Sequence, residues 1–290
     1  MKCNLCPREC GVDRNTDTGW CKMGKSAMVA KVMLHHWEEP PISGERGSGA
    51  IFFSGCSLRC VYCQNKDISR GQVGKPYTAA DLAGEMLRLQ DMGAHNVNLV
   101  TPTHFSDVIR DAIDLIRDKL TIPVVYNTSG YEKPSEIAKM AGYVDVFLTD
   151  MKYFSPVYSQ KYSHAPDYFA VAKESLGRML EISPECVFNE DGTMKKGVIV
   201  RHLVLPSLRR DSIAVLEELS REFDTKSFKL SLMAQYTPEF CDEGYPELAR
   251  KITTFEYNSV VDKALELGYD GYIQDKSASS VKYTPNFKED

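Results

Sequence analysis

Residues 50–236 alternate short apolar runs with longer amphipathic stretches. Each run ends at polar or turn-forming residues, which is typical of a strand. Between residues 104 and 120, Phe105, Ile109 and Ile116 recur at helical spacing, which predicts a helix with one buried face. The predicted strands are 50–55, 96–101, 123–129, 144–150, 198–206 and 228–236, and the predicted helices are 78–93, 104–120, 134–142, 167–182 and 209–223, with a hairpin at 189–197.

This strand-helix alternation is typical of parallel βα units, so the sequence predicts the α/β class. Six such units are fewer than the eight of a closed barrel, and right-handed crossovers curl them into an open, partial (β/α)6 TIM-like barrel. We expect a short Cys-rich N-terminal segment over residues 1–49, followed by the barrel over residues 50–290. The sequence GERGSG at 44–49 is interpreted as a flexible connector between them.

Charge and composition exclude several classes of protein. The 290-residue chain has a net charge of -5 and no concentrated Lys/Arg stripe, so we expect neither a nucleic-acid nor an anionic-membrane partner. No apolar run approaches the roughly 20 residues that span a bilayer, and the amino terminus lacks a signal-peptide core. We therefore expect a cytoplasmic protein. Its nine cysteines favour metal ligation over disulfides in that reducing compartment, although Cys186 and Cys241 stand alone as small thiols.

Three of these cysteines, Cys56, Cys60 and Cys63, follow the first predicted strand with C-x3-C-x2-C spacing. Thiolates are soft ligands that suit zinc or iron-sulfur clusters. No fourth cysteine lies nearby, so a cluster in this loop would keep one metal position without a protein ligand. An open metal position usually indicates chemistry rather than a structural site.

The loop, with the aromatic Tyr62 directly before its last cysteine, resembles the C-x3-C-x-aromatic-C signature of the radical S-adenosylmethionine (SAM) superfamily. This resemblance implies that Cys56, Cys60 and Cys63 are the catalytic ligands of a [4Fe-4S] cluster, with SAM chelating the remaining iron. It also implies that a one-electron reductant, such as flavodoxin or ferredoxin, reduces the cluster. The reduced cluster then cleaves SAM to methionine and a 5′-deoxyadenosyl radical. A structural zinc loop is the competing interpretation, but zinc supplies no electron.

Within the superfamily, residues 50–275 resemble pyruvate formate-lyase activating enzymes, through CSLRCVYCQN, YNTSGY, TDMKY and RHLVLPS. The chain departs from them at VTPTH, where these enzymes carry a Gly-Gly-Glu type motif. The resemblance implies contacts with SAM from Tyr62, Asn65, Thr101, Thr103, Asn127, Thr128, Ser129, Asp150, Lys152, Arg201 and His202. Gln235 and Tyr236 are candidates to face the substrate, with a core position as the alternative for Tyr236.

A second cysteine group, Cys3, Cys6, Cys10 and Cys21, provides four soft ligands in a short segment. A similar Cys-rich leader occurs in the activating-enzyme-like branch that this chain resembles. Three interpretations remain open for it. The segment holds a structural zinc ion, an auxiliary iron-sulfur cluster, or unmetallated thiols that shape the mouth of the active site.

Two functional hypotheses follow. The first is a radical SAM enzyme that abstracts hydrogen from a protein or peptide, including the glycine of a glycyl-radical enzyme, or from a small molecule. The second is a non-catalytic iron-sulfur electron-transfer or metal-binding protein. A carrier takes all cluster ligands from the protein and has no use for polar residues converging on an open iron, so the strand-end residues distinguish the two.

Overall fold

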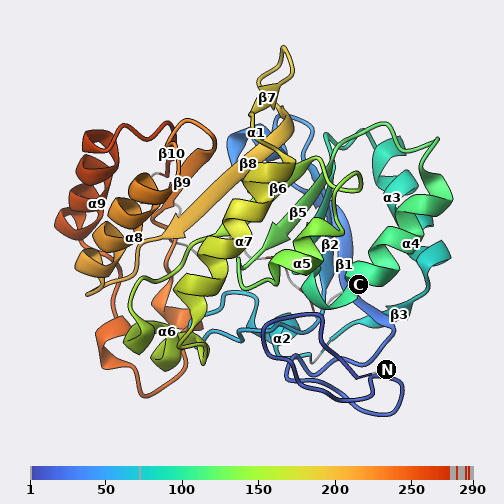
Figure 1. Ribbon diagram of the computed structural model, residues 1–290, viewed down its shortest axis with the longest axis horizontal. Helices are drawn as coiled ribbons and strands as arrows, with labels where there is room; N and C mark the ends of the chain where they lie inside the picture. The colour runs from blue at the N-terminus through green and yellow to red at the C-terminus, as the bar shows by residue number, and fades with distance from the viewer. Residues whose placement is uncertain (1, 72, 275–278, 280–284, 286, 288–290) are drawn as a thin grey trace.

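The computed structural model describes residues 2–71, 73–274, 279, 285 and 287 (Figure 1). Its strands form one sheet in the order β10-β9-β8-β6-β5-β4-β2-β1-β3, with β7 paired to β8 alone. The strands are β1 (Ala27–His35), β2 (Ser48–Phe53), β3 (Lys75–Tyr77), β4 (Val97–Val100), β5 (Val124–Thr128), β6 (Val146–Asp150), β7 (Val187–Phe188), β8 (Met194–Leu203), β9 (Lys229–Met233) and β10 (Gly271–Ile273). All six predicted strands are present.

Parallel pairing runs without interruption from β2 to β10. The mixed α/β class with a mostly parallel sheet is therefore confirmed, consistent with a partial barrel. β10 adds a parallel strand that the sequence did not predict, because its three residues are too few to show a pattern. At the other edge β1 and β3 run antiparallel.

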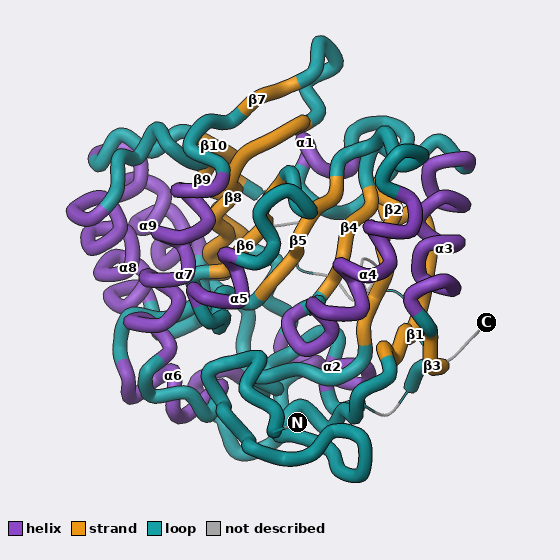
Figure 2. Tube along the Cα trace, turned by 45° about the vertical axis from the view of Figure 1, so that its right-hand side comes forward, coloured by secondary structure: helices purple, strands orange, loops and turns teal. Residues whose placement is uncertain are grey.

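Helices cover the outer face of the sheet (Figures 1 and 2). Thr78 begins α3 with a capping box to Asp81, which explains why the predicted helix starts there. The helices are α1 (Pro40–Ser43), α2 (Lys66–Ser69), α3 (Ala79–Asp91), α4 (Ser106–Ile116), α5 (Pro134–Ala138), α6 (Pro156–Ser163), α7 (Tyr168–Ile182), α8 (Arg209–Glu222) and α9 (Thr254–Glu266), with short 3-10 turns η1 (Thr103–Phe105), η2 (Pro238–Phe240) and η3 (Pro246–Leu248).

Strand β1 lies between β2 and the edge strand β3, so the first 49 residues do not form a segment separate from the sheet. It pairs with β2 over the register Val32↔Ile51 to His35↔Ser48, so part of the predicted N-terminal segment belongs to the sheet. The interpretation of residues 44–49 as a flexible connector was wrong. Ser48 and Gly49 begin β2, and Ser48 Oγ donates to Asn96 Oδ1 at 2.7 Å in the core. Gly49 is required there, because a Cβ would lie 2.8 Å from the Asn96 carbonyl oxygen.

Residues 2–24 lie at the carboxyl ends of the parallel strands, beside α2 and the loop 54–65 (Figures 1 and 2). Gly55 marks the close approach of the two segments. Its φ is +84°, and a Cβ there would lie 2.6 Å from the carbonyl oxygen of Cys21. The cysteine-rich segment is therefore packed against the loop that carries Cys56, Cys60 and Cys63.

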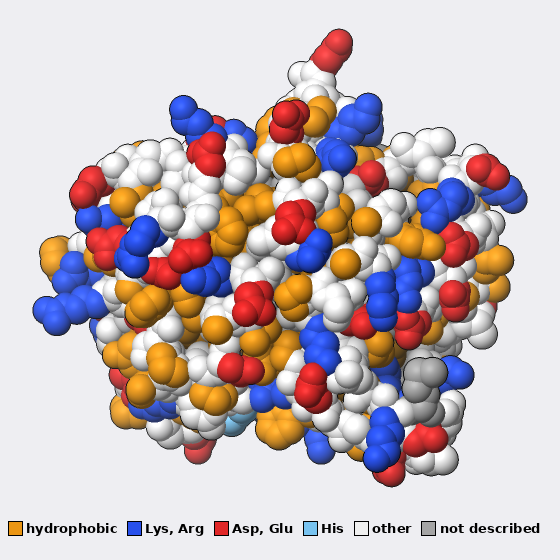
Figure 3. Space-filling model, viewed as in Figure 1, with side chains coloured by type: hydrophobic (Ala, Val, Ile, Leu, Met, Phe, Trp, Pro, Cys, Tyr) orange, Lys and Arg blue, Asp and Glu red, His pale blue; other side chains and the backbone are white. Residues whose placement is uncertain are grey.

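No helix within the described ranges is long and apolar enough to cross a membrane. On the face shown in Figure 3, Lys and Arg side chains are interspersed with Asp and Glu rather than gathered in one stripe.

Candidate active site

A cavity of about 210 Å³ lies at the carboxyl ends of the parallel strands. Every one of the six predicted strand ends contributes to it, because parallel strands end at the same edge of a sheet. The predicted site residues that line it are Cys56, Cys60, Tyr62, Cys63, Asn65, Thr101, Asn127, Thr128, Ser129, Asp150, Lys152 and Arg201, together with Gln235 and Tyr236. The structure thus brings together residues that are far apart in the sequence.

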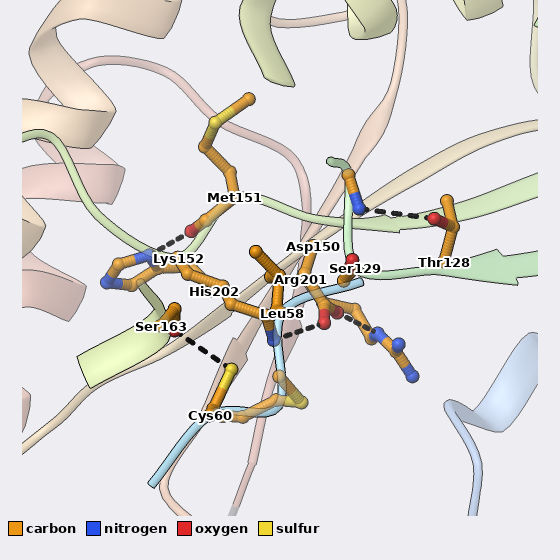
Figure 4. Close-up of polar contacts among 12 residues, drawn as sticks. Leu58, Cys60, Thr128, Ser129, Asp150, Met151, Lys152, Ser163, Arg201 and His202 are labelled. Carbon is orange, nitrogen blue, oxygen red and sulfur yellow. Dashed lines mark hydrogen bonds and ion pairs between the residues drawn. The ribbon is translucent and has the colours of Figure 1, made fainter. Parts of the chain in front are cut away.

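The loop after β2 presents all three cysteines to this cavity. Cys56 Sγ accepts a hydrogen bond from the Leu58 amide at 3.4 Å, and Cys60 Sγ accepts one from Ser163 Oγ at 2.9 Å (Figure 4). Burial raises the pKa of Cys60, and burial together with the neighbouring thiols raises the pKa of Cys63 to about 12. Such thiols are neutral unless a cation binds, so metal ligation would release their protons.

These residues fit a [4Fe-4S] cluster with one iron open to SAM. No other cysteine of the described residues lines the cavity, and its remaining wall combines strand-end polar groups with apolar side chains such as Phe52, Leu203 and Met233. Asn65 Oδ1 is buried and has no hydrogen-bond partner in the described part of the chain. Tyr62 is held by a 2.6 Å hydrogen bond between its hydroxyl and that of Tyr153. The donor set, the open wall and the unsatisfied oxygen all suit a polar ligand beside the cysteines.

The centre of the polar wall is an ion-pair network around Asp150. Its carboxylate accepts from Arg201 Nε at 2.8 Å and from Lys152 Nζ at 2.6 Å (Figure 4). Burial alone would raise the pKa of Asp150, but Arg201 and Lys152 outweigh it and hold that pKa below its ordinary value. Arg201 also donates to Asn127 Oδ1 at 2.7 Å. These four residues are therefore fixed before any ligand binds, which lowers the entropy cost of binding.

Two acidic residues of the site were missed by sequence reasoning. Arg201 reaches Glu38 at 3.3 Å and Glu39 at 3.9 Å, both from the segment between β1 and α1. Burial raises the pKa of Glu39 to about 7, and burial also raises that of Glu38. The only signal was WEEPP, a tryptophan and two acids beside two prolines, in a segment that we placed outside the barrel.

Two predicted site residues do not line the cavity. Thr103 Oγ1 donates instead to Glu132 Oε1 at 2.5 Å in the core. His202 lies on the face of β8 opposite Arg201, because successive strand residues alternate between faces. Its Nδ1 is 2.6 Å from the Met151 carbonyl oxygen, and burial lowers its pKa to about 4 (Figure 4).

A second cavity, of about 450 Å³, adjoins the first on the side of β9 and β10. The two share a wall made of Trp37, Glu38, Arg201, Met233 and Gln235. Ser231 and Glu39 line the second cavity but not the first, and Ser231 Oγ donates to Glu39 Oε1 at 3.2 Å. The site therefore consists of a compartment beside the cysteines and a second one beyond Arg201, which we term the polar compartment for its charged groups and which apolar side chains such as Met233 also line.

The amino-terminal cysteines lie outside both cavities, in the segment packed on the loop 54–65, which carries Cys56, Cys60 and Cys63 and is called the cluster loop below. Cys6 and Cys21 are buried, and Cys3 and Cys10 are half-buried. Cys10 Sγ accepts the Trp20 amide hydrogen at 3.1 Å. Arg8 connects this segment to the site, because its guanidinium donates to the carbonyl oxygens of Ser57 at 2.8 Å and Ser163 at 3.0 Å.

Comparison with known proteins agrees with this geometry. Residues 50–192 match the family model described as the radical SAM superfamily. The chain is 31% identical over 276 residues to the uncharacterized protein MJ0674 of Methanocaldococcus jannaschii, an alignment that covers 91% of this chain and 73% of that relative.

Among solved structures, the chain is similar to Streptococcus suis SuiB, bound to the precursor peptide SuiA (TM-score 0.49, 13% identity) and bound to S-adenosylmethionine (TM-score 0.48, 14% identity). Each match covers 76% of this chain, which spans 46% and 48% of the two SuiB chains. The family model, the relative that is aligned over 73% of its length and the three-cysteine loop together show that the chain belongs to the radical SAM superfamily, whose enzymes use a [4Fe-4S] cluster and SAM and need a reductant.

Proposed function

We propose that this radical SAM enzyme abstracts a hydrogen atom from a substrate that enters through the cavity beside β9 and β10. The observation that carries this proposal is the shared wall between the two cavities, which puts a separate polar compartment next to the one lined by the three cysteines. A non-catalytic electron carrier has no need of either compartment.

The residues around the first cavity have separable roles in this proposal. Cys56, Cys60 and Cys63 would hold the cluster. Lys152 and Arg201 would bind the carboxylate of SAM, and Asp150 its amino group, because the charges are complementary and already positioned. When bound, the cluster supplies one electron to the sulfonium of SAM, which breaks a carbon-sulfur bond. Tyr62, held by Tyr153, would orient the adenine.

The polar compartment would bind the substrate. Its charged side chains are Glu38, Glu39 and Arg201, with Ser231 and Gln235 as hydrogen-bonding groups. The resemblance to pyruvate formate-lyase activating enzymes supports a protein or peptide substrate, including a glycyl-radical partner, and the compartment also suits a small molecule. Flavodoxin or ferredoxin is the proposed reductant. A cytoplasmic location stays a prediction.

The first test is SAM cleavage by the anaerobically reconstituted and reduced protein. Wild type is expected to form 5′-deoxyadenosine, and Cys60→Ala none. Cys241→Ala is the matched control, because this thiol lies outside the cavity, and it should keep the wild-type yield. Equal yields from wild type and Cys60→Ala would end the catalytic proposal.

The second test concerns the substrate compartment. Gln235→Trp would place a larger side chain in the wall that the two cavities share and narrow the passage between them, while leaving the cysteines unchanged. In both proteins we then measure deuterium transfer into 5′-deoxyadenosine. The deuterium donor is either a labelled peptide of a glycyl-radical partner or the labelled small molecules of a cell extract. Gln235 also lines the compartment beside the cysteines, so the yield of 5′-deoxyadenosine is measured in the same samples. Loss of transfer in the variant with an unchanged yield would support entry through the second compartment, and transfer equal to wild type would contradict it.

A further inference from the structure

The segment of residues 2–24 places its four cysteines within electrostatic reach of one another. Cys21 interacts with Cys3 and Cys10, and Cys6 with Cys10 and Cys21. Gly19 lies between two of the sulfurs. A Cβ at that position would be 3.4 Å from Cys10 Sγ and 3.7 Å from Cys21 Sγ, so the glycine leaves the space around them open.

The backbone holds this arrangement independently of the cysteine side chains. The Cys3 amide donates to the Val12 carbonyl at 2.8 Å, and the Gly11 amide donates to the Cys3 carbonyl at 3.0 Å. The Glu9 amide closes a turn on the Cys6 carbonyl at 3.1 Å. Cys3, Cys6 and Cys10 therefore belong to one folded loop. The backbone at Gly19 and Trp20 brings Cys21 close to this loop.

Three arginines, Arg8 and Arg14 of this segment and Arg59 of the neighbouring loop, have no carboxylate partner among the described residues. Arg8 donates to backbone carbonyls, and Arg14 donates to those of His104, at 2.6 Å, and Gly24. Arg59 stacks on Trp20 at 4.1 Å and interacts electrostatically with both Cys56 and Cys21. Carbonyl oxygens and the aromatic faces of Trp20, Tyr131 and Phe105 meet their charge, so an anionic group beside the cysteines would find three guanidinium groups close to it.

The position of Arg59 is informative because it lies between the two cysteine groups. Its Nε is buried and has no hydrogen-bond partner within the described ranges, as is also the case for Arg14 Nε. A cluster bound by Cys56, Cys60 and Cys63 would place negative charge on one side of the Arg59 guanidinium. A second anionic centre on the side of Cys21 would place negative charge on the other side of Arg59 and beside Arg8 and Arg14.

We propose that Cys3, Cys6, Cys10 and Cys21 bind a second [4Fe-4S] cluster, with the three arginines compensating its charge. Four thiolates around such a core carry net negative charge. This proposal concerns a separate site and does not depend on the substrate proposed above.

A [4Fe-4S] cluster and a single zinc ion differ in the spacing of their four thiolates. A zinc ion draws its four thiolates to about 2.3 Å from one point, whereas the ligands of a cubane bind different irons and stay further apart. The space that Gly19 leaves open beside Cys10 Sγ and Cys21 Sγ suits the wider spacing of a cluster, and the content of iron and zinc decides between the two metals. Unmetallated thiols, the third interpretation, would leave the three guanidinium groups with carbonyl oxygens and aromatic rings alone.

The test is iron and sulfide analysis of the full chain, purified and reconstituted without oxygen, with EPR of the reduced protein. Wild type is expected to bind about eight irons. The variant Cys56→Ala/Cys60→Ala/Cys63→Ala should keep about half of that iron and a [4Fe-4S] signal. Cys6→Ala/Cys21→Ala should lose about half, and Cys186→Ala/Cys241→Ala, the matched control, should lose none.

The triple variant keeps the proposal falsifiable even where the amino-terminal variant fails to fold. Iron absent from the triple variant would overturn the proposal. So would one equivalent of zinc retained in its place, which would identify a structural zinc site. Retention of about half of the iron with the EPR signal, lost on adding Cys6→Ala, would support it.

Discussion

Ser163 Oγ lies 2.9 Å from Cys60 Sγ and donates a hydrogen bond to it. Ser163 is the last residue of α6, and it is 103 residues away from Cys60 in the sequence. The same hydroxyl lies 2.9 Å from the Tyr153 hydroxyl, which in turn contacts Tyr62 at 2.6 Å. A single serine therefore connects Cys60, a proposed cluster ligand, through Tyr153 to the tyrosine proposed to orient the adenine.

Removing this hydroxyl should lower the reduction potential of the cluster. A hydrogen bond to a cluster sulfur stabilises the more negative, reduced state, so Ser163→Ala makes reduction harder. The cost to folding should be about 1 kcal/mol, as for one buried hydrogen bond. Potentiometric titration followed by EPR measures the potential.

Ser159→Ala is the matched control, because Ser159 is a buried serine of the same helix whose hydroxyl donates to the Pro156 carbonyl. It should leave the potential unchanged. An unaltered potential in Ser163→Ala would show that this hydrogen bond does not tune the cluster.

Lys152→Met should weaken SAM binding. Lys152 is half-buried beside Asp150, and that carboxylate outweighs the effect of burial and raises the lysine pKa above its ordinary value, so the ammonium is charged at neutral pH. A charged hydrogen bond contributes about 1.5–3 kcal/mol, so the Kd for SAM should rise roughly 10- to 100-fold. Anaerobic equilibrium dialysis measures this. Lys173→Met, in a surface ion pair with Glu218, is the control, and equal Kd values in both variants would contradict the assigned role.

Glu132 should make the protein less stable as pH rises. Burial raises its pKa from 4.5 to about 7, so between these values the folded chain keeps a proton that the unfolded chain has lost. The free energy of unfolding therefore decreases from pH 4.5 to about 7, by about 3 kcal/mol from this group. Glu132→Gln mimics the neutral form and still accepts from Thr103 and Thr128.

Denaturant unfolding at pH 5 and pH 8 checks this expectation. The difference in unfolding free energy between the two pH values should become smaller in Glu132→Gln than in wild type. Glu190→Gln, at an exposed turn, should leave the difference unchanged. An identical pH dependence in all three proteins would show that Glu132 does not titrate in this range.

Arg8→Met should loosen the cysteine-rich segment from the cluster loop. Arg8 donates to the carbonyl oxygens of Ser57, Ser163 and His164, which a methionine side chain cannot bond. We expect a loss of on the order of 2 kcal/mol, because the guanidinium is only partly buried. Hydrogen exchange of residues 54–65 should accelerate. Arg46→Met, which removes a bond to the Gly93 carbonyl at the opposite end of the sheet, should leave that loop protected.

Much of the site could be predicted because parallel strands end at one edge. Thr101, Asn127, Asp150 and Arg201 follow four different apolar runs, and the topology brings all four to one cavity. The prediction was less accurate for a residue directly next to a correctly predicted one on the same strand. Arg201 and His202 are adjacent in the sequence, yet strand alternation points only the first into the cavity.

The sequence by itself determined the alternating elements, the parallel sheet and the three-cysteine loop, because these depend on local periodicity and on spacing within one segment. Only the tertiary structure decided that Glu38 and Glu39 join Arg201, that Ser163 bonds Cys60, and that Arg8, Arg14 and Arg59 lie beside the amino-terminal cysteines. Those contacts join segments that are distant along the chain, and no local pattern of residues encodes which of them meet.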